Sequence, residues 1–264
     1  MNIVITGSTK GIGLGLATEF ARQGHKVVIS GRNKGVVEAC VSSLSNMPGK
    51  VYGCACDVSV YEQVKALWDF ADQEMRGVDI WINNAGLART VWPIVETPAN
   101  EIHAMIHTNM LGMTYGSQVA AKGFLIKGRG KIFNMLGGGS DGEIFPGMGI
   151  YGTTKRGLDY FTNALTKELK DSGIIVGKIR PGMIITEGVI REAKADLENF
   201  EKSRKTMNNL VDTIDNVAPF LVEKILNTEK TGTKIRWLNG QKIALRMLKA
   251  RFKDRPDQFA QFGL

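Results

Sequence analysis

The chain opens on NIVITGSTKGIG, residues 2–13, a short apolar run that passes directly into a loop with three glycines. The apolar run predicts a buried strand, and the residues from Ile12 onward have the pattern of a helix. A glycine-rich turn in this setting indicates dinucleotide binding. Gly7 permits the tight turn, Gly11 lets the backbone approach the phosphates, and Gly13 lets helix and strand pack closely. We expect the N–H groups at the start of the helix to bind the pyrophosphate.

The rest of the chain repeats this alternation of apolar runs and amphipathic stretches of helical length. Such an alternation is the pattern of βαβ units and a parallel sheet. We therefore expect an α/β protein with a Rossmann-type, doubly wound, parallel sheet of seven strands in a single domain. The expected strands are 2–6, 26–30, 51–56, 79–83, 131–135, 174–179 and 234–238, and the expected helices are 12–23, 34–46, 60–75, 100–126, 150–171 and 214–226.

The composition of the 264 residues, with 43% hydrophobic and 23% charged, is typical of a globular protein with a large core. No apolar run is long enough to span a membrane, and the first strand begins at Asn2. We therefore expect a soluble or cytoplasmic protein with no targeting segment in this chain. Cys40, Cys54 and Cys56 form no CxxC pair, so we expect neither a disulfide framework nor a metal site.

The formal net charge of +8 is concentrated near the C-terminus. The segment QKIALRMLKARFKDR, residues 241–255, carries six cations against Asp254 alone and interleaves them with large apolar residues. We predict a main domain over 1–240 and a basic amphipathic tail over 241–264. Such a segment lies on an anionic membrane, or packs on its own body or an oligomer partner, and the pattern leaves these alternatives open. Nucleic-acid binding is not expected, because the charge outside the tail is close to balanced.

The stretch 187–212 interrupts the alternation of strands and helices with polar, charge-rich sequence. It follows Pro181 and Gly182, close to the expected carboxyl end of a strand. A segment that leaves a sheet at this edge is well placed to cover a ligand. We interpret it as a substrate lid, with an ordinary solvated helix as the alternative.

The sequence YGTTK places Tyr151 and Lys155 four residues apart on an expected helix. Residues at this spacing share one helix face, so an ammonium group can lie near a phenol whose ordinary pKa is about 10. The phenol could then donate or accept a proton near neutral pH. A lone YxxxK is weak evidence, but downstream of a dinucleotide loop it indicates a functional pair.

The second expected strand ends in KVVISGRN, with Gly31 and Arg32 at its carboxyl end. A site that prefers NAD usually has a carboxylate here for the ribose hydroxyls. Arg32, helped by Lys10 and Ser30, would instead bind a 2′-phosphate, so we expect NADPH. The alternative is that both cations are ordinary solvated side chains.

These motifs resemble, in their order and spacing, the short-chain dehydrogenase/reductase family over roughly residues 1–240. The matching pieces are TGSTKGIG, CDVS, NNAG, NMLG, YGTTK and PGMIIT. The resemblance implies a cofactor site made of Gly7, Ser8, Thr9, Lys10, Gly11, Ile12, Gly13, Arg32, Asp57, Val58, Asn84, Ala85, Gly86, Tyr151, Lys155, Pro181, Gly182, Ile184 and Thr186. Within it, Asp57 and Val58 would flank the adenine, and Ile184 with Thr186 would hold the nicotinamide carboxamide.

The same resemblance implies the catalytic roles. Tyr151 would be the general acid in carbonyl reduction, and Lys155 would bind the nicotinamide ribose and lower the pKa of the phenol. Asn109 would anchor a water that links Lys155 to solvent, although its side chain could simply satisfy a helix kink. The chemistry needs such groups, because hydride addition to a carbonyl leaves an alkoxide that must be stabilised and protonated.

One position departs from the family pattern. The family usually has a serine 13 residues before the tyrosine, and this chain has Gly138 there, in FNMLGGGSDG. Ser140 is the nearest hydroxyl, and the glycines at 137–139 leave the loop free to bring it to the substrate. The alternative is that Ser140 and Asp141 form a turn and that backbone N–H groups polarise the carbonyl.

The motif set TGSTKGIG, DIWINNAG, FNMLGGGSDG and YGTTKR, with the late IRWLNG, resembles the chlorophyll b reductase branch of the family. This implies NADPH-dependent reduction of the 7-formyl group of chlorophyll b, or chlorophyllide b, to 7-hydroxymethyl chlorophyll a. It also implies a homo-oligomer and leaves open a peripheral contact with a photosynthetic membrane. Another ketone, aldehyde or acyl substrate is the alternative. A nucleotide sensor without catalysis is disfavoured by the intact Tyr151, Lys155 and Asn109.

Apolar residues flank the expected catalytic face and would line an open site for a bulky substrate. They suit a flat macrocycle, but equally a steroid or an acyl chain. They are Trp92, Phe145, Met148, Met183, Ile184, Ile185 and Val189.

Overall fold

Seven parallel strands form a single sheet in the computed structural model of the chain, which describes residues 1–264. The strand order is β3-β2-β1-β4-β5-β6-β7, so the predicted doubly wound fold is confirmed. The order reverses between β1 and β4, which places a crevice at their carboxyl ends. The strands are β1 (Asn2–Ile5), β2 (Lys26–Gly31), β3 (Val51–Ala55), β4 (Ile80–Asn83), β5 (Gly130–Met135), β6 (Ile174–Arg180) and β7 (Lys234–Arg236).

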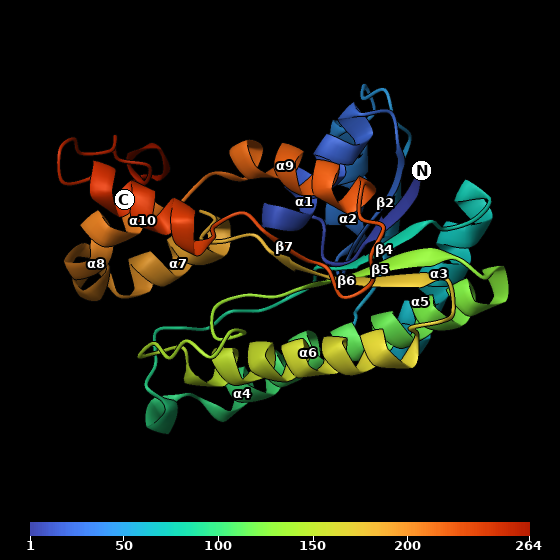
Figure 1. Cartoon of the computed structure of the whole chain (residues 1–264), viewed down its shortest axis with the longest axis horizontal. Coiled ribbons are helices and arrows are strands. Elements are labelled where there is room, and N and C mark those ends of the chain that lie inside the picture. The colour runs from blue at the N-terminus through green and yellow to red at the C-terminus, as the bar shows by residue number, and fades with distance from the viewer.

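Helices cover both faces of the sheet (Figure 1). Side chains alternate along β1, so Ile3 and Ile5 enter one core while Val4 enters the other. The first core packs against α1 (Gly11–Arg22) and α9 (Ile214–Leu226), on the face that also carries α2 (Lys34–Ser43). The second packs against α3 (Tyr61–Met75) and α5 (Gly112–Lys127), on the face that also carries α6 (Gly149–Glu168).

The helix expected over 100–126 is confirmed as one helical run over 99–127. It consists of α4 (Ala99–Met105), a π-helical turn (Ile106–Leu111) and then α5. The sequence did not predict the π turn, because such a turn adds a residue to one turn without changing the composition of the sequence. Asn109 lies within this turn, and such turns occur most often at functional sites.

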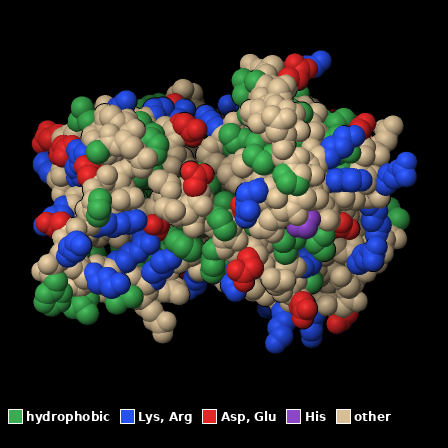
Figure 2. All heavy atoms as spheres, turned by 90° about the horizontal axis from the view of Figure 1, so that it is seen from above, with side chains coloured by type: hydrophobic (Ala, Val, Ile, Leu, Met, Phe, Trp, Pro, Cys, Tyr) green, Lys and Arg blue, Asp and Glu red, His purple; other side chains and the backbone are tan.

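The C-terminal third adds helices beyond the sheet. The stretch expected to be a lid contains α7 (Glu187–Ala195) and α8 (Leu197–Leu210), and the tail contains α10 (Gly240–Lys249), which packs on α8. Figure 1 shows these three helices gathered at one end of the molecule, and Figure 2 shows many Lys and Arg side chains on that part of one face. Short 3-10 turns span Ile94–Glu96 and Ala260–Phe262. None of the helices combines the length and the apolar character needed to cross a bilayer.

Candidate active site

The glycine loop after β1 packs against the loop after β4 with almost no space between the two backbones. Gly7 has a φ of 60°, and a side chain there would place its Cβ 2.7 Å from the Ala85 Cα. The Asn84 side chain donates hydrogen bonds to the carbonyls of Thr6 (3.0 Å) and Gly7 (2.9 Å). Only glycine combines this backbone angle with this approach. The two predicted cofactor motifs therefore form one rigid surface at the switch point of the sheet.

The start of α1 faces this surface and the segment that follows β6. A Cβ on Gly13 would lie 2.4 Å from the Asn84 Nδ2, and a Cβ on Gly11 would lie 3.4 Å from the Thr186 Cγ2. Lys10, the N-cap residue of α1, makes no side-chain cap. The first N–H groups of the helix are thus free of a side-chain acceptor, which suits the binding of a pyrophosphate.

The loops after β1 and β2 meet at Thr9 and Gly31, where a Cβ on Gly31 would lie 2.7 Å from the Thr9 Cγ2. Lys10 and Arg32 follow these contact points and are both exposed. Ser30 is fully buried, and its hydroxyl donates to the Ile5 carbonyl at 3.4 Å. The expectation that Ser30 helps to bind a phosphate was therefore wrong, because its side chain faces the protein interior.

Other predicted cofactor residues complete the same edge. Ser8 is fully buried and accepts a hydrogen bond from the Ser30 N–H at 2.9 Å, which ties β1 to β2. Asp57 Oδ1 accepts hydrogen bonds from the backbone and hydroxyl of Ser59, and Val58 packs next to Gly112 of α5. Ile12 packs against the first core. Most of these side chains contact other parts of the protein, so they set the shape of the site.

Tyr151 and Lys155 lie on α6 as predicted. Lys155 is buried, with its Nζ 5.7 Å from the centre of the Tyr151 ring, and it donates a hydrogen bond to the Met135 carbonyl at 3.1 Å. A Cβ on Gly86 would lie 3.6 Å from both the Lys155 Nζ and the Asn109 Oδ1. The structure thus brings Lys155 and Asn109 together beside the loop after β4, with Tyr151 next to Lys155.

Asn109 is fully buried and joins the loop after β4 to helix α6. It accepts a hydrogen bond from the Leu87 N–H (2.7 Å) and donates to the Leu87 carbonyl (2.9 Å) and to the Thr154 hydroxyl (3.0 Å). The Thr154 hydroxyl in turn donates to the Tyr151 carbonyl at 2.7 Å. The π turn therefore gives Asn109 partners outside its own helix, and the alternative role of satisfying a kink does not describe these contacts.

Burial controls the acidity of the catalytic pair. It raises the pKa of the Tyr151 phenol to about 12, although the charge of Arg180 acts in the opposite direction. It lowers the pKa of the Lys155 ammonium from 10.5 to about 8. The expected lowering of the phenol pKa by Lys155 is not found, because desolvation outweighs nearby charge and the ammonium is bonded to Met135. At neutral pH the phenol keeps the proton that a general acid must donate.

The loop after β5 presents Gly137 to the phenol. A Cβ on Gly137 would lie 2.2 Å from the Tyr151 Oη, whereas a Cβ on Gly138 would meet the Met148 Cε at 2.7 Å. Gly137, rather than the Gly138 identified by counting from the tyrosine, is thus the residue opposite the phenol. Ser140 is fully buried, and its hydroxyl has no hydrogen-bond partner.

An ion-pair network that the sequence did not suggest anchors this loop to the sheet. Asp141 pairs with Arg180 of β6 and with Lys234 and Arg236 of β7, and Glu143 pairs with Arg180. The signal was present as the repeated tripeptide KIR, at 178–180 and 234–236. Because these strands pair in register, four cations lie side by side and require carboxylates. The partners could not be chosen without the fold.

The segment after β6 leads into α7, the start of the stretch that was predicted to be a lid. Pro181 is buried, and Gly182 has a φ of 84° where its backbone passes Leu238. Ile184 is 4% exposed and packs in the first core, while the Thr186 side chain accepts the Val189 N–H as the cap of α7. Both residues follow the carboxyl end of β6, and Thr186 lies next to Gly11 at the start of α1.

A second set of contacts missed by sequence reasoning holds α7 to the loop after β4. Glu192 accepts a hydrogen bond from the Thr90 N–H at 2.8 Å and pairs with Arg89 at 3.8 Å, while Arg89 also pairs with Glu101 at 2.9 Å. Glu192 lies 102 residues from Thr90 in the chain. The stretch predicted to be a lid therefore contacts the rim of the site directly.

The short chain dehydrogenase family model matches residues 1–197, which is most of the chain. The chain belongs to the short-chain dehydrogenase family. As a member, it is an oxidoreductase that uses a nicotinamide dinucleotide. The catalytic pair, the glycine loop and the loop after β4 all lie within the matched residues.

Relatives in this short-chain dehydrogenase family include two plant enzymes. The chain is 38% identical to the chloroplastic chlorophyll(ide) b reductase NOL of Oryza sativa subsp. japonica, over 93% of this chain and 74% of the relative. It is 36% identical to chlorophyll(ide) b reductase NOL of Arabidopsis thaliana, over 91% of this chain and 71% of the relative. Among solved structures, ElxO with NADP bound is 27% identical, with a TM-score of 0.78, over 89% of this chain and 96% of the other.

The lowered pKa of Lys155 predicts a pH-dependent stability. The folded protein holds this proton less tightly than the unfolded chain, so the cost of burying the ammonium is present below about pH 8 and is relieved as pH rises toward 10.5. In Lys155→Met that cost is absent at every pH. We expect the stability of wild type relative to Lys155→Met to increase between pH 7 and pH 10, measured by urea denaturation.

Lys167→Met provides the matched control, because Lys167 is exposed on the same helix. Its stability relative to wild type should stay nearly constant over the same pH range. If the stability of Lys155→Met changed with pH in parallel with that of wild type, the lowered pKa of Lys155 would be contradicted.

Proposed function

We propose that this protein is an NADPH-dependent reductase of the 7-formyl group of chlorophyll b or chlorophyllide b, with 7-hydroxymethyl chlorophyll a as the product from chlorophyll b. The observation that carries the proposal is how much of the chain matches the plant chlorophyll(ide) b reductases. The general family model ends at residue 197, whereas the match to the Oryza sativa reductase takes in 93% of the chain. The likeness therefore continues well past the residues that the general family model matches.

The proposed chemistry needs a hydride and a proton, one for each end of the carbonyl. The bound nicotinamide would supply the hydride to the formyl carbon. Tyr151 would donate its proton to the oxygen, because its raised pKa keeps it protonated at neutral pH. Lys155 would hold the nicotinamide ribose, and Asn109 would link Lys155 to solvent through a water. The C=O bond becomes a C–OH bond, and solvent restores the proton on Tyr151.

A large flat substrate finds apolar side chains beside this pair. Ile94 and Val95, from the short turn after β4, are 62% and 92% exposed, and Ile144 and Phe145, from the loop after β5, are 93% and 52% exposed. The two loops adjoin, since a Cβ on Gly149 would meet the Ile94 side chain at 2.4 Å. Exposed apolar side chains gathered at a catalytic site favour an apolar ligand.

NADPH is the proposed cofactor, because the carboxyl end of β2 carries the exposed Arg32 and no carboxylate. The exposed Lys10 follows Thr9, which contacts Gly31 of that strand end. Two cations at this place would bind a 2′-phosphate by charge-assisted hydrogen bonds.

Two partners are proposed in addition. One is a second copy of the chain, as in other members of the family. The other is an anionic photosynthetic membrane, contacted peripherally by the tail. In support of the latter, α10 and the residues after it expose Leu245, Leu248 and Phe252, at 50%, 52% and 84%, next to the exposed cations Lys249 and Arg251.

Incubation with NADPH and detergent-dispersed chlorophyll b should yield the 7-hydroxymethyl pigment, separated by chromatography. Tyr151→Phe should lower kcat by at least about a hundredfold while NADPH affinity stays within about twofold, because only the proton donor is lost. Consumption of ordinary ketones without turnover of chlorophyll b or chlorophyllide b would favour the alternative, a general carbonyl reductase.

Arg32→Ser should raise the KM for NADPH by about tenfold or more and leave the KM for NADH nearly unchanged, because only NADPH carries the 2′-phosphate. Steady-state kinetics with each cofactor measure the two values. Lys34→Ser removes a nearby exposed cation and should change neither. Equal effects of Arg32→Ser on both cofactors would remove Arg32 from phosphate recognition.

Ser140→Ala tests the proposed carbonyl-binding hydroxyl. A buried hydroxyl without a partner is costly, so unpaired groups of this kind call for a functional explanation. If the glycine-flanked loop brings Ser140 to the substrate oxygen, kcat should fall by about a hundredfold with NADPH affinity retained. An unchanged kcat would instead assign this role to the backbone N–H groups of the glycine run.

A further inference from the structure

The carboxylate of Asp212 joins three parts of the C-terminal region. Asp212 is 3% exposed and accepts hydrogen bonds from the Trp237 Nε1 at 2.6 Å and from the Arg246 and Arg255 Nη2 atoms, both at 2.9 Å. Trp237 follows β7, Arg246 lies on α10, and Arg255 lies in the segment after α10. A buried carboxylate is tolerated only with such complete pairing, so its position depends on all three donors.

The backbone of the same residue holds the segment after β6. The Asp212 N–H donates to the Met183 carbonyl at 2.9 Å, and the Ile185 N–H donates to the Asp212 carbonyl at 3.0 Å. Ile184 between them forms a parallel bridge with Asp212. This is the segment in which the family resemblance implies that Ile184, together with Thr186, holds the nicotinamide carboxamide. One residue therefore contacts the C-terminal extension with its side chain and the nicotinamide segment with its backbone.

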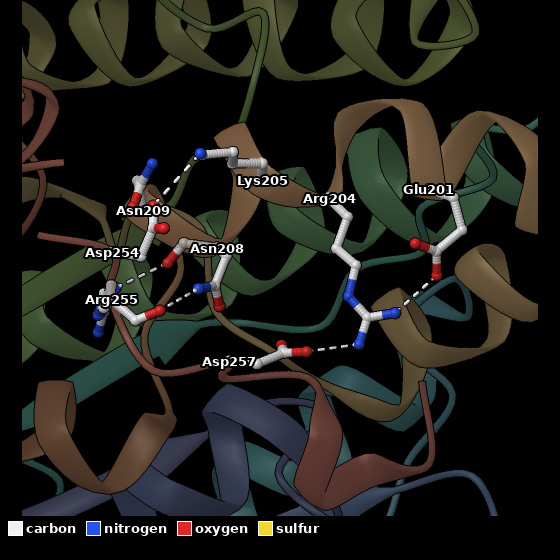
Figure 3. A pocket seen from close by; sticks show the side chains of 8 residues that line it. All are labelled: Glu201, Arg204, Lys205, Asn208, Asn209, Asp254, Arg255 and Asp257. Atoms are coloured by element: carbon white, nitrogen blue, oxygen red, sulfur yellow. Dashed lines mark hydrogen bonds and ion pairs between the residues drawn. The ribbon is translucent and has the colours of Figure 1, made fainter. Parts of the chain in front are cut away.

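Further polar contacts fix the extension to α8 around a polar pocket (Figure 3). Lys205 pairs with Asp254 at 3.3 Å, Arg204 pairs with Asp257 at 2.5 Å, and the Arg255 guanidinium donates to the Asn208 carbonyl at 3.1 Å. The Lys205 pair is exposed and contributes little, since surface ion pairs are worth roughly 0 to 1 kcal/mol. Asp212 is the buried member of the contacts between the extension and the rest of the protein. Because its backbone is bonded to Met183 and Ile185, loss of its side-chain partners must also move that backbone.

We propose that Asp212 is a positioning residue, through which the C-terminal extension sets the place of Met183–Ile185 against the nicotinamide end of the cofactor. The inference rests on the proposed function for the identity of the cofactor. Removing the Arg246 guanidinium leaves a buried carboxylate short of partners, and the carboxylate then shifts toward water. Because Asp212 shares two backbone hydrogen bonds with Met183 and Ile185, that shift moves the nicotinamide segment. The adenosine end lies on the loops after β1, β2 and β3, which make no hydrogen bond with Asp212.

Titration calorimetry with two ligands separates this role from a general structural one. Arg246→Met should bind NADPH about tenfold more weakly than wild type, the size of a typical coupling between sites. The same variant should bind 2′,5′-ADP unchanged, because that ligand fills only the adenosine end. Arg246→Lys, which keeps a cation near Asp212, should recover part of the lost NADPH affinity. Lys249→Met, an exposed charge on the same helix, is the matched control and should leave both affinities unchanged.

Trp237→Phe gives a milder second variant, since it removes the indole donor and keeps an aromatic ring against Phe220. It should also bind NADPH more weakly and 2′,5′-ADP unchanged, with a smaller loss of NADPH affinity than Arg246→Met. Unchanged NADPH affinity in Arg246→Met and Trp237→Phe would overturn the proposal, as would an equal loss for both ligands. A wild-type protein that binds NADPH but leaves both pigments unreduced would contradict the proposed substrate alone. A wild type that binds no nicotinamide dinucleotide would overturn both.

Discussion

Close approach of backbones at the carboxyl ends of β1, β4 and β5 is the constraint on which the site depends. Gly7 touches Ala85, Gly13 touches Asn84, and Gly137 lies against the phenol of Tyr151, each at a distance that leaves no room for a Cβ. Space taken by a side chain at any of these points would separate the loops. The absence of side chains thus creates the surface that a dinucleotide can lie on, and it leaves room beside it for the phenol of Tyr151.

Once these loops are packed together, burial determines the electrostatics of the centre. Lys155 is buried and Tyr151 is partly buried, and this desolvation disfavours the charged form of each, so it raises the pKa of the phenol and lowers that of the ammonium. The surrounding charges have another task. Arg180, Lys234 and Arg236 neutralise the carboxylates of the loop after β5, so that a glycine-rich segment with little intrinsic stiffness is held at the sheet edge. The loop after β5 thus combines glycines, which leave its backbone free to take unusual angles, with ion pairs that attach it to β6 and β7.

Ion pairs also hold the segment after β6, through contacts made by the C-terminal third. The family fold supplies a segment after β6 with Gly182 at positive φ, but that segment pairs with Asp212 rather than with a strand of the sheet. Asp212 in turn is held by Trp237, Arg246 and Arg255. Two cations of the basic tail, Arg246 and Arg255, therefore pair with a buried carboxylate, while apolar residues on the outside of the tail remain exposed.

The sequence by itself determined the seven strands, the helices of the sheet layers, the glycine loop and the pairing of Tyr151 with Lys155. These features are encoded by neighbours, through apolar periodicity and the i to i+4 spacing of a helix face. Only the tertiary structure decided that Asn109 lies in a π turn, that Ser30 faces the interior, that Gly137 stands opposite the phenol, and that Asp212 joins the tail to the segment after β6. Each of these depends on residues far apart in the chain, whose contact follows from strand order and packing and leaves no periodic trace in the sequence.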